Sequence, residues 1–184
     1  CKKIENIKEE VNRLDMAIAT AISQLDFLYE NALEKVGKGQ AEIFEVHKML
    51  IQDKDFQGDI VAIITTESVN AEYAVEKAGN KYKQMFAAME NEYMQERSQD
   101  IGDISERMIR VLLGEEENEI VVNEPMIVVA DDLSPSETIR MDKSKVIGFI
   151  MKKGTVNSHT AILARSMNLP SLVKVEVGQN GICS

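Results

Sequence analysis

A chain of 184 residues is long enough for one medium domain or two small ones, but too short for a large enzyme. Its 21 basic and 31 acidic residues give a net charge of −10, which argues against nucleic-acid binding, because nucleic-acid-binding proteins usually present a basic face. The apolar stretches are too short to span a bilayer, and no signal peptide is visible. Two cysteines near opposite ends exclude a disulfide framework and a zinc site, so we expect a metal-free protein of the reducing cytoplasm.

The composition changes abruptly along the chain. No proline precedes residue 114, whereas Pro125, Pro135 and Pro170 all follow it. A proline-free part rich in Ala, Glu, Met, Leu and Lys is typical of helices. Short β-branched runs that alternate with helical patterns are typical of an α/β unit. We therefore predict an α+β protein with a helical domain at 1–118 and a partial α/β domain at 119–184, separated by the acidic stretch Gly114–Glu119.

The first part is expected to fold as an antiparallel helical bundle. Apolar residues spaced by three or four from Ile4 to Ala32 predict a long first helix that ends near Gly37. Its apolar seam could also form an intermolecular coiled coil, although the long helical segments that follow favour packing within the chain. Further helices are predicted over residues 40–52, 56–67, 70–98 and 100–113. The fourth of these five helices carries a stripe predicted to be core: Tyr82, Met85, Phe86, Met89 and Tyr93.

The second part is predicted to form a small parallel α/β unit. A buried strand over residues 126–130 precedes a short helix, with Ser134 as its cap and Pro135 in its first turn. A second strand over 146–151 leads into a glycine-led loop and a helix over 159–168, which Pro170 ends. Strand, loop, helix and strand in this order are typical of such a unit.

His159 is the most plausible position for chemistry. It lies at the start of a helix, where unpaired N–H groups and a partial positive charge favour an anion. The hydroxyls of Ser158 and Thr160 can donate to phosphate oxygens, and Gly154 lets the backbone bend to expose the imidazole. A neutral imidazole is a good nucleophile towards phosphorus, so these residues fit a histidine that carries a phosphoryl group. A helix-capping histidine beside a turn is the alternative on spacing alone.

The segment GTVNSHTAILARSMNLPSLV resembles the phosphohistidine signature of phosphoenolpyruvate-utilising enzymes, which dikinases share. Four other segments are similar to Enzyme I of the phosphotransferase system, phosphoenolpyruvate–protein phosphotransferase: GQAEIFEVHKMLIQD, EYMQERSQDIGDISERMIRVLLG, VVADDLSPSET and VIGFI. The resemblance runs from about Gln40 to Val173, and the first helix fits as well. It implies a helical subdomain that binds the carrier HPr, followed by part of the α/β phosphohistidine swivelling domain.

The resemblance also implies a mechanism in which His159 receives phosphoryl from phosphoenolpyruvate and passes it to a histidine of HPr. Thr138 matches a family residue whose hydroxyl contacts the active imidazole, which would hold the tautomer that leaves Nε2 free to attack. Arg165 belongs to the motif but lies about 120° round the helix from His159, so we expect it to brace the domain or meet a partner.

The implied HPr-binding surface consists of residues at the end of the second helix and the start of the third: Met49, Leu50, Asp53, Asp55 and Phe56. Apolar anchors in an acidic surround would suit a basic carrier. For Met49 and Leu50, ordinary bundle core is an equal alternative. His47, in the same helix, is expected to be a partly buried, hydrogen-bonded histidine beside this surface.

The chain departs from the family pattern at Thr155 and Lys174, where glycine is usual, and the resemblance is expected to end before Val175–Ser184. A strand before the first helix and the phosphoenolpyruvate-binding barrel are missing, so we interpret the chain as truncated. No cofactor is expected in it. Magnesium is implied for the full-length enzyme, with ligands outside this sequence, and phosphoenolpyruvate would bind only through the missing domain. Two alternatives remain, a non-catalytic partner-binding module and the histidine domain of a pyruvate phosphate dikinase.

Overall fold

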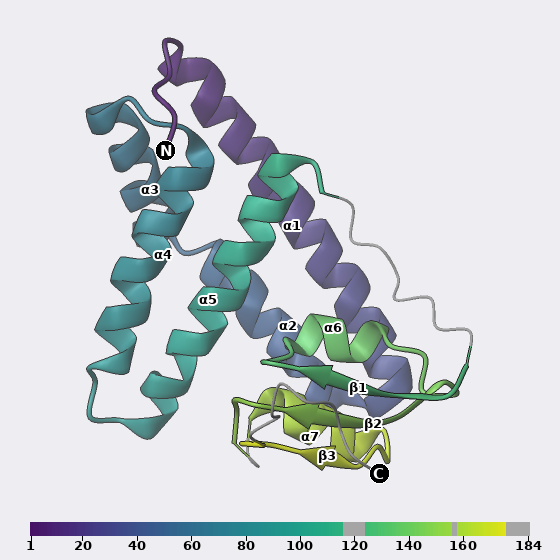
Figure 1. Cartoon of the computed structure of the whole chain (residues 1–184). Coiled ribbons are helices and arrows are strands. Elements are labelled where there is room, and N and C mark those ends of the chain that lie inside the picture. Colours follow the sequence, from purple (N-terminus) through teal and green to yellow (C-terminus); the bar gives the residue numbers. More distant parts are fainter. Residues whose placement is uncertain (116–123, 156–157, 176–184) are drawn as a thin grey trace, which may run out of the picture. The chain divides into compact units, whose positions relative to one another are not determined.

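The computed structural model describes residues 1–115, 124–155 and 158–175, and within these ranges it has seven helices and a three-stranded sheet (Figure 1). The chain divides into two compact units, one of Cys1–Phe27 and Phe44–Glu117, the other of Leu28–Ile43 and Asn118–Ser184. Helices α1 (Ile7–Val36) and α2 (Lys38–Ile51) contribute residues to both units. The expected boundary after residue 118 lies outside the described residues and stays a prediction. None of the described helices has the length and hydrophobicity needed to span a membrane.

The first unit contains the predicted antiparallel helices. Helix α3 (Lys54–Glu67) runs antiparallel to α4 (Ala71–Ala87), joined by the ion pairs Lys77–Glu67 at 2.7 Å and Lys81–Asp59 at 2.6 Å. Helix α4 also packs along α5 (Glu92–Leu113). At this contact a Cβ on Gly79 would lie 2.3 Å from Ser105 Oγ, so glycine is what permits the close approach of the two helices.

The apolar seam of α1 is buried as predicted. Leu14, Ala21 and Leu25 are at most 1% exposed in the first unit, and Leu28 and Ala32 are fully buried in the second. Burial of this seam within a single chain accounts for its period without an intermolecular coiled coil.

The prediction of one helix over residues 70–98 was wrong, because the chain turns between Ala87 and Glu92. Asn91 caps the new helix, with its Oδ1 accepting from the Tyr93 backbone N–H at 2.9 Å. The predicted break near residue 99 is absent, and α5 continues through it with Asp100 buried. The residues of this turn are good helix formers, so side-chain capping and packing decided its position against local propensity.

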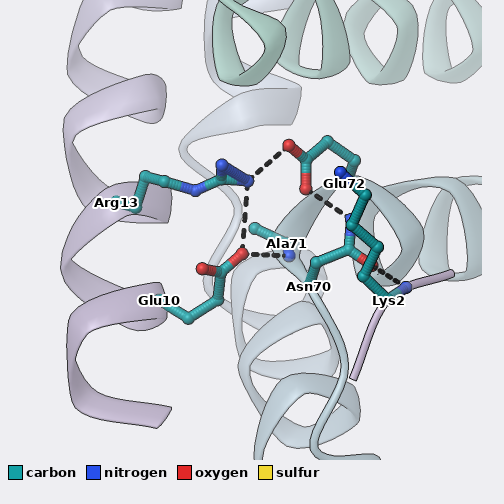
Figure 2. Close-up of polar contacts among 6 residues, drawn as sticks. All are labelled: Lys2, Glu10, Arg13, Asn70, Ala71 and Glu72. Carbon is teal, nitrogen blue, oxygen red and sulfur yellow. Dashed lines mark hydrogen bonds and ion pairs between the residues drawn. The ribbon is translucent and has the colours of Figure 1, made fainter. Parts of the chain in front are cut away.

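The residues before α1 are bound to the start of α4 (Figure 2). The backbone N–H of Lys2 donates to Asn70 Oδ1 at 2.7 Å, and that of Ala71 donates to Glu10 Oε1 at 2.6 Å. Arg13 Nη2 lies 3.2 Å from Glu10 Oε1 and 2.5 Å from Glu72 Oε1. Two acids around one guanidinium thus join α1 to α4, and the Lys2–Asn70 bond joins the first residues of the chain to the start of α4.

The second unit holds the parallel sheet, in the order β1 (Met126–Ala130), β2 (Val146–Met151) and β3 (Ser171–Leu172). Helix α6 (Pro135–Arg140) connects β1 to β2, and α7 (His159–Ser166) connects β2 to β3. The predicted strands and the start of α6 are confirmed: Ser134 and Glu137 form a capping box, with Pro135 in the first turn. Lys35 Nζ, from the last turn of α1, donates to the Ile139 carbonyl at 2.8 Å.

The predicted burial of β1 was wrong. Ile127 and Val129 alternate along the strand and are 51% and 44% exposed. In β2, by contrast, Phe149 and Met151 are buried. A continuous apolar run is typical of a strand covered on both faces, whereas this strand has one face open in the described part of the chain.

Candidate functional site

The candidate site lies where the chain leaves the carboxyl ends of β1 and β2. The backbone N–H groups of Lys152 and Lys153 donate to the carbonyls of Ala130 and Asp131, at 3.1 and 2.9 Å. These bonds continue the strand pairing past the end of the sheet. In open α/β sheets, ligands bind at this edge, outside the carboxyl ends of the strands. The fold therefore places the loop before His159 at the edge where ligands usually bind.

His159 begins α7 shortly after a backbone bend at Gly154. Gly154 has a φ of +90°, which disfavours any residue with a side chain and confirms that this glycine lets the backbone bend. The Ser158 N–H donates to the Thr155 carbonyl at 3.1 Å, and Ser158 Oγ accepts from the Ala161 N–H at 3.3 Å as the helix cap. His159 is the first residue of the helix and is half-buried. Its side chain therefore stands at the positive end of the α7 dipole.

Thr160 has a different role from the one predicted. Thr160 is 5% exposed, and its hydroxyl donates to the Leu133 carbonyl, just before the cap of α6. Because a hydroxyl has a single proton to donate, Thr160 is not a phosphate donor in this conformation, and that prediction needs correction. The bond instead holds the start of α7 beside the start of α6. Ser158 keeps its hydroxyl proton, since its oxygen acts as an acceptor in the cap.

Thr138 is fully buried in α6, and its hydroxyl donates to the Ser134 carbonyl at 2.9 Å. This bond fixes the hydroxyl proton and leaves the oxygen lone pairs able to accept, as an imidazole N–H would require. The contact between Thr138 and His159 stays a prediction. Arg165 lies exposed in the last turn of α7, and its bracing or partner-binding role stays a prediction as well.

Of the two departures from the family pattern, only Lys174 is conformationally unusual. Its φ of +59° lies in the left-handed region, whereas Thr155 has no positive φ. A usual glycine at position 174 is therefore explained by backbone geometry, and a threonine at 155 carries no such cost.

Replacing Lys174 with glycine is expected to stabilise the second unit by about 0.5–1 kcal/mol, because the left-handed conformation then costs nothing. Urea unfolding of the full chain would measure the change. Lys153→Gly is the matched control, since Lys153 is exposed and has no positive φ. It should lower stability by about 0.5–1 kcal/mol, because glycine adds entropy to the unfolded chain. Equal effects of the two changes would contradict the explanation.

In the ranges that the structure describes, no three His, Cys, Asp or Glu side chains are grouped so that they could hold a metal ion. The expectation that magnesium is bound by ligands outside this sequence stays a prediction.

The residues predicted to bind HPr differ in exposure. Met49 is 67% exposed and Asp55 is also exposed, while Leu50 is half-buried. Asp53 is exposed but caps α3, its Oδ1 accepting from the Phe56 N–H at 2.8 Å. Phe56 is only 1% exposed and packs edge-on against Tyr82, with ring centroids 5.2 Å apart. Its prediction as a contact residue was therefore wrong, because it fills the core beneath the surface.

Two further residues that the sequence interpretation had assigned to the core are exposed. Met85 and Tyr93 are 44% and 59% exposed. The Phe56–Tyr82 contact places the start of α3 beside the part of α4 that carries Met85. We call Met49, Asp53, Asp55, Met85 and Tyr93 the docking surface. Helical period alone could not reveal that these two members of the predicted stripe are exposed.

His47 is 1% exposed and lies 3.3 Å from Asp100, which confirms the buried, hydrogen-bonded histidine that we predicted. Of the two histidines, only His159 has access to solvent.

Comparison with known proteins agrees with this architecture. The family model described as "PEP-utilising enzyme, N-terminal" matches residues 2–97, and "PEP-utilising enzyme, mobile domain" matches residues 122–180. The chain therefore belongs to the phosphoenolpyruvate-utilising enzymes. The second match extends to residue 180, so the prediction that the resemblance ends before Val175 was wrong.

Within this family, the similar proteins are phosphoenolpyruvate-protein phosphotransferases. That of Bacillus subtilis (strain 168) is 39% identical over 98% of this chain, and that of Mycoplasma capricolum is 37% identical over 92% of it. A solution NMR structure of Enzyme I, 36% identical, has a TM-score of 0.77 and matches 94% of this chain and 71% of its own. The N-terminal domain of Enzyme 1 - Nitrogen, at 23% identity and a TM-score of 0.69, shares the fold. The chain spans about one third of the length of the curated relatives, covering 33% and 30% of these two.

Proposed function

We propose that this chain is the phosphoryl-carrying and carrier-docking part of an Enzyme I-type phosphotransferase. The observation that carries the proposal is His159, half-buried at the N-terminus of α7 on the carboxyl edge of the parallel sheet. In the transfer, the lone pair on His159 Nε2 attacks phosphorus, and the bond from phosphorus to the donor breaks. The phosphoryl group then passes from His159 to a histidine of HPr by the same displacement.

The surroundings of His159 suit this step. The start of α7 favours the negative charge of the phosphoryl group. The hydroxyl of Ser158 can donate to a phosphoryl oxygen while its own oxygen caps the helix. The Thr138 oxygen would accept from Nδ1–H and so hold the tautomer in which Nε2 is free. Phosphoryl transfer depends mainly on such positioning and charge stabilisation.

Phosphoenolpyruvate and its magnesium would bind to parts of the enzyme outside this sequence, as the one-third coverage of the relatives favours. We place the complete enzyme in the cytoplasm, where HPr would meet it. Relatives named phosphoenolpyruvate-protein phosphotransferase favour this function over the dikinase alternative.

The test is incubation of the chain with phosphorylated HPr, without phosphoenolpyruvate. We expect acid-labile, alkali-stable phosphate on the chain at up to one group per molecule, since a phosphorus–nitrogen bond has that stability. Binding of HPr without any label would leave only the non-catalytic interaction module. Absence of binding would contradict both functions.

The docking surface predicts how HPr binds. Met49, Met85 and Tyr93 supply exposed apolar anchors, and Asp53 and Asp55 supply negative charge for a basic carrier. Met49→Asp should weaken HPr binding by about tenfold or more, because it removes an anchor and leaves a charge to be desolvated. Titration calorimetry would measure it. Met16→Asp is the control, since Met16 is 73% exposed on α1 outside this surface and the charge change is identical. Equal losses from both changes would contradict the assignment.

A further inference from the structure

A buried polar cluster joins α2 to α5 and takes no part in the proposed transfer at His159. Asp100 and His47 are each 1% exposed, and Asp100 Oδ1 lies 3.3 Å from His47 Nε2. Arg97 Nη1 donates to the other oxygen, Oδ2, at 2.6 Å. The two oxygens of one carboxylate thus bind side chains from α2 and from the preceding turn of α5.

The bond to His47 joins Asp100 to the helix that carries Met49. A carboxylate only accepts hydrogen bonds, so Asp100 would accept from His47 in the tautomer that carries the proton on Nε2. The ring of His47 also meets Phe44 edge-on, with centroids 6.4 Å apart. Met49 lies two residues after His47 in α2. The contacts of the His47 ring with Phe44 and of its Nε2 with Asp100 therefore hold the helical turn that carries Met49.

The bond to Arg97 leads to the other anchor, Tyr93. The Arg97 side chain is 12% exposed, and its guanidinium carbon lies 4.4 Å from the centroid of the Tyr93 ring. A cation over an aromatic face is attracted by the ring quadrupole, which limits how the exposed ring can turn. Burial lowers the pKa of Arg97, but the bonds to Asp100 and Tyr93 outweigh it and raise the pKa above its ordinary value. Arg97 therefore remains a cation between Asp100 and Tyr93.

We propose that Asp100 is a positioning residue for carrier docking, which orients Tyr93 through Arg97 and the Met49 turn of α2 through His47. This inference rests on the proposed function and concerns the affinity for HPr, not the chemistry at His159. A buried ion pair is often no more stabilising than apolar residues of similar volume, because both charges lose their hydration. Orientation of two separate surface anchors is a role that apolar residues at these positions could not fill.

The test is a double-mutant cycle on HPr affinity in the full chain, measured by titration calorimetry. Asp100→Asn keeps the size of the side chain but removes the charge that holds Arg97. We expect it and Tyr93→Ala each to weaken binding by about tenfold, and the double variant by much less than the product of about a hundredfold. Losses that multiply fully, or an unchanged affinity of Asp100→Asn, would overturn the inference.

The matched control is Gln24→Ala. Gln24 Oε1 accepts a hydrogen bond from Arg107 Nη1 at 2.9 Å. Arg107 is a buried cation further along α5 than Arg97. This change also removes a bond to a buried cation of α5, so it should lower the unfolding temperature while HPr affinity stays within about twofold. An equal loss of affinity in the control would show that destabilised helices, not anchor orientation, weaken docking.

A carrier-free measurement separates this inference from the proposed function. The Arg97 Nε–H resonance should be shifted by the Tyr93 ring current in the unmodified chain and move towards the position of a free arginine in Asp100→Asn. An unchanged resonance would overturn the positioning role even if HPr binds. If the unmodified chain does not bind HPr, the proposed function fails, and this resonance still decides the role of Asp100.

Discussion

Replacing His159 with alanine is expected to abolish the transfer of phosphate from phosphorylated HPr to this chain, lowering the rate at least about a thousandfold. In the proposed function the imidazole of His159 is the nucleophile, and the other histidine, His47, is 1% exposed and engaged with Asp100. Labelling with radioactive phosphate followed by acid and alkali treatment would measure the effect. Binding of HPr should remain within about twofold, because His159 lies outside the docking surface.

The control for this result is the fold of the second unit. His159 is half-buried at the start of α7, and the cap of this helix is the neighbouring Ser158. Removal of the imidazole should therefore leave the unfolding transition nearly unchanged. His47→Gln should retain the label. Phosphate that persists on the His159→Ala chain would contradict the assignment of the acceptor.

Replacing Phe56 with alanine is expected to destabilise the first unit by about 3–5 kcal/mol, the usual cost of truncating a buried phenylalanine. The ring is 1% exposed and lies edge-on to Tyr82, so its loss leaves a cavity between α3 and α4. Urea unfolding followed by circular dichroism would measure the change.

Met49→Ala is the matched comparison, because Met49 was also predicted to contact HPr but is 67% exposed. Its truncation should lower stability by less than about 0.5 kcal/mol. Phe56→Leu should lower stability less than alanine does and leave HPr affinity within about twofold, since a leucine still fills most of the site. The reverse pattern, a lost affinity with unchanged stability, would restore Phe56 as a contact residue.

Much of the second unit could be predicted from sequence because its signals are local. The Ser134 cap, the proline after it, and Gly154 each reflect the conformation of one turn, and all three are observed. The role of Thr160 could not be predicted, because its partner is the Leu133 carbonyl, 27 residues earlier in the chain. At Lys174 the family pattern predicts a glycine, and the positive φ of the structure gives the physical reason for that glycine.

In the first unit, helical period predicted which segments are helices but not where the chain turns. A stripe of Met and aromatic residues is compatible with a core and with an exposed docking face, since both need apolar side chains three or four residues apart. Only the tertiary structure shows that Met85 and Tyr93 are exposed.

Whether Phe56 and Met49 are buried or exposed was likewise decided by the tertiary structure. Both lie near the α2–α3 connection, yet Phe56 is 1% exposed and Met49 is 67% exposed. The sequence by itself determined the helical and α/β parts and the glycine bend before His159, because these depend on residues close together in the chain. Which apolar side chains are exposed, and which charged side chains are buried, was decided only by the tertiary structure, because burial depends on neighbours distant in sequence.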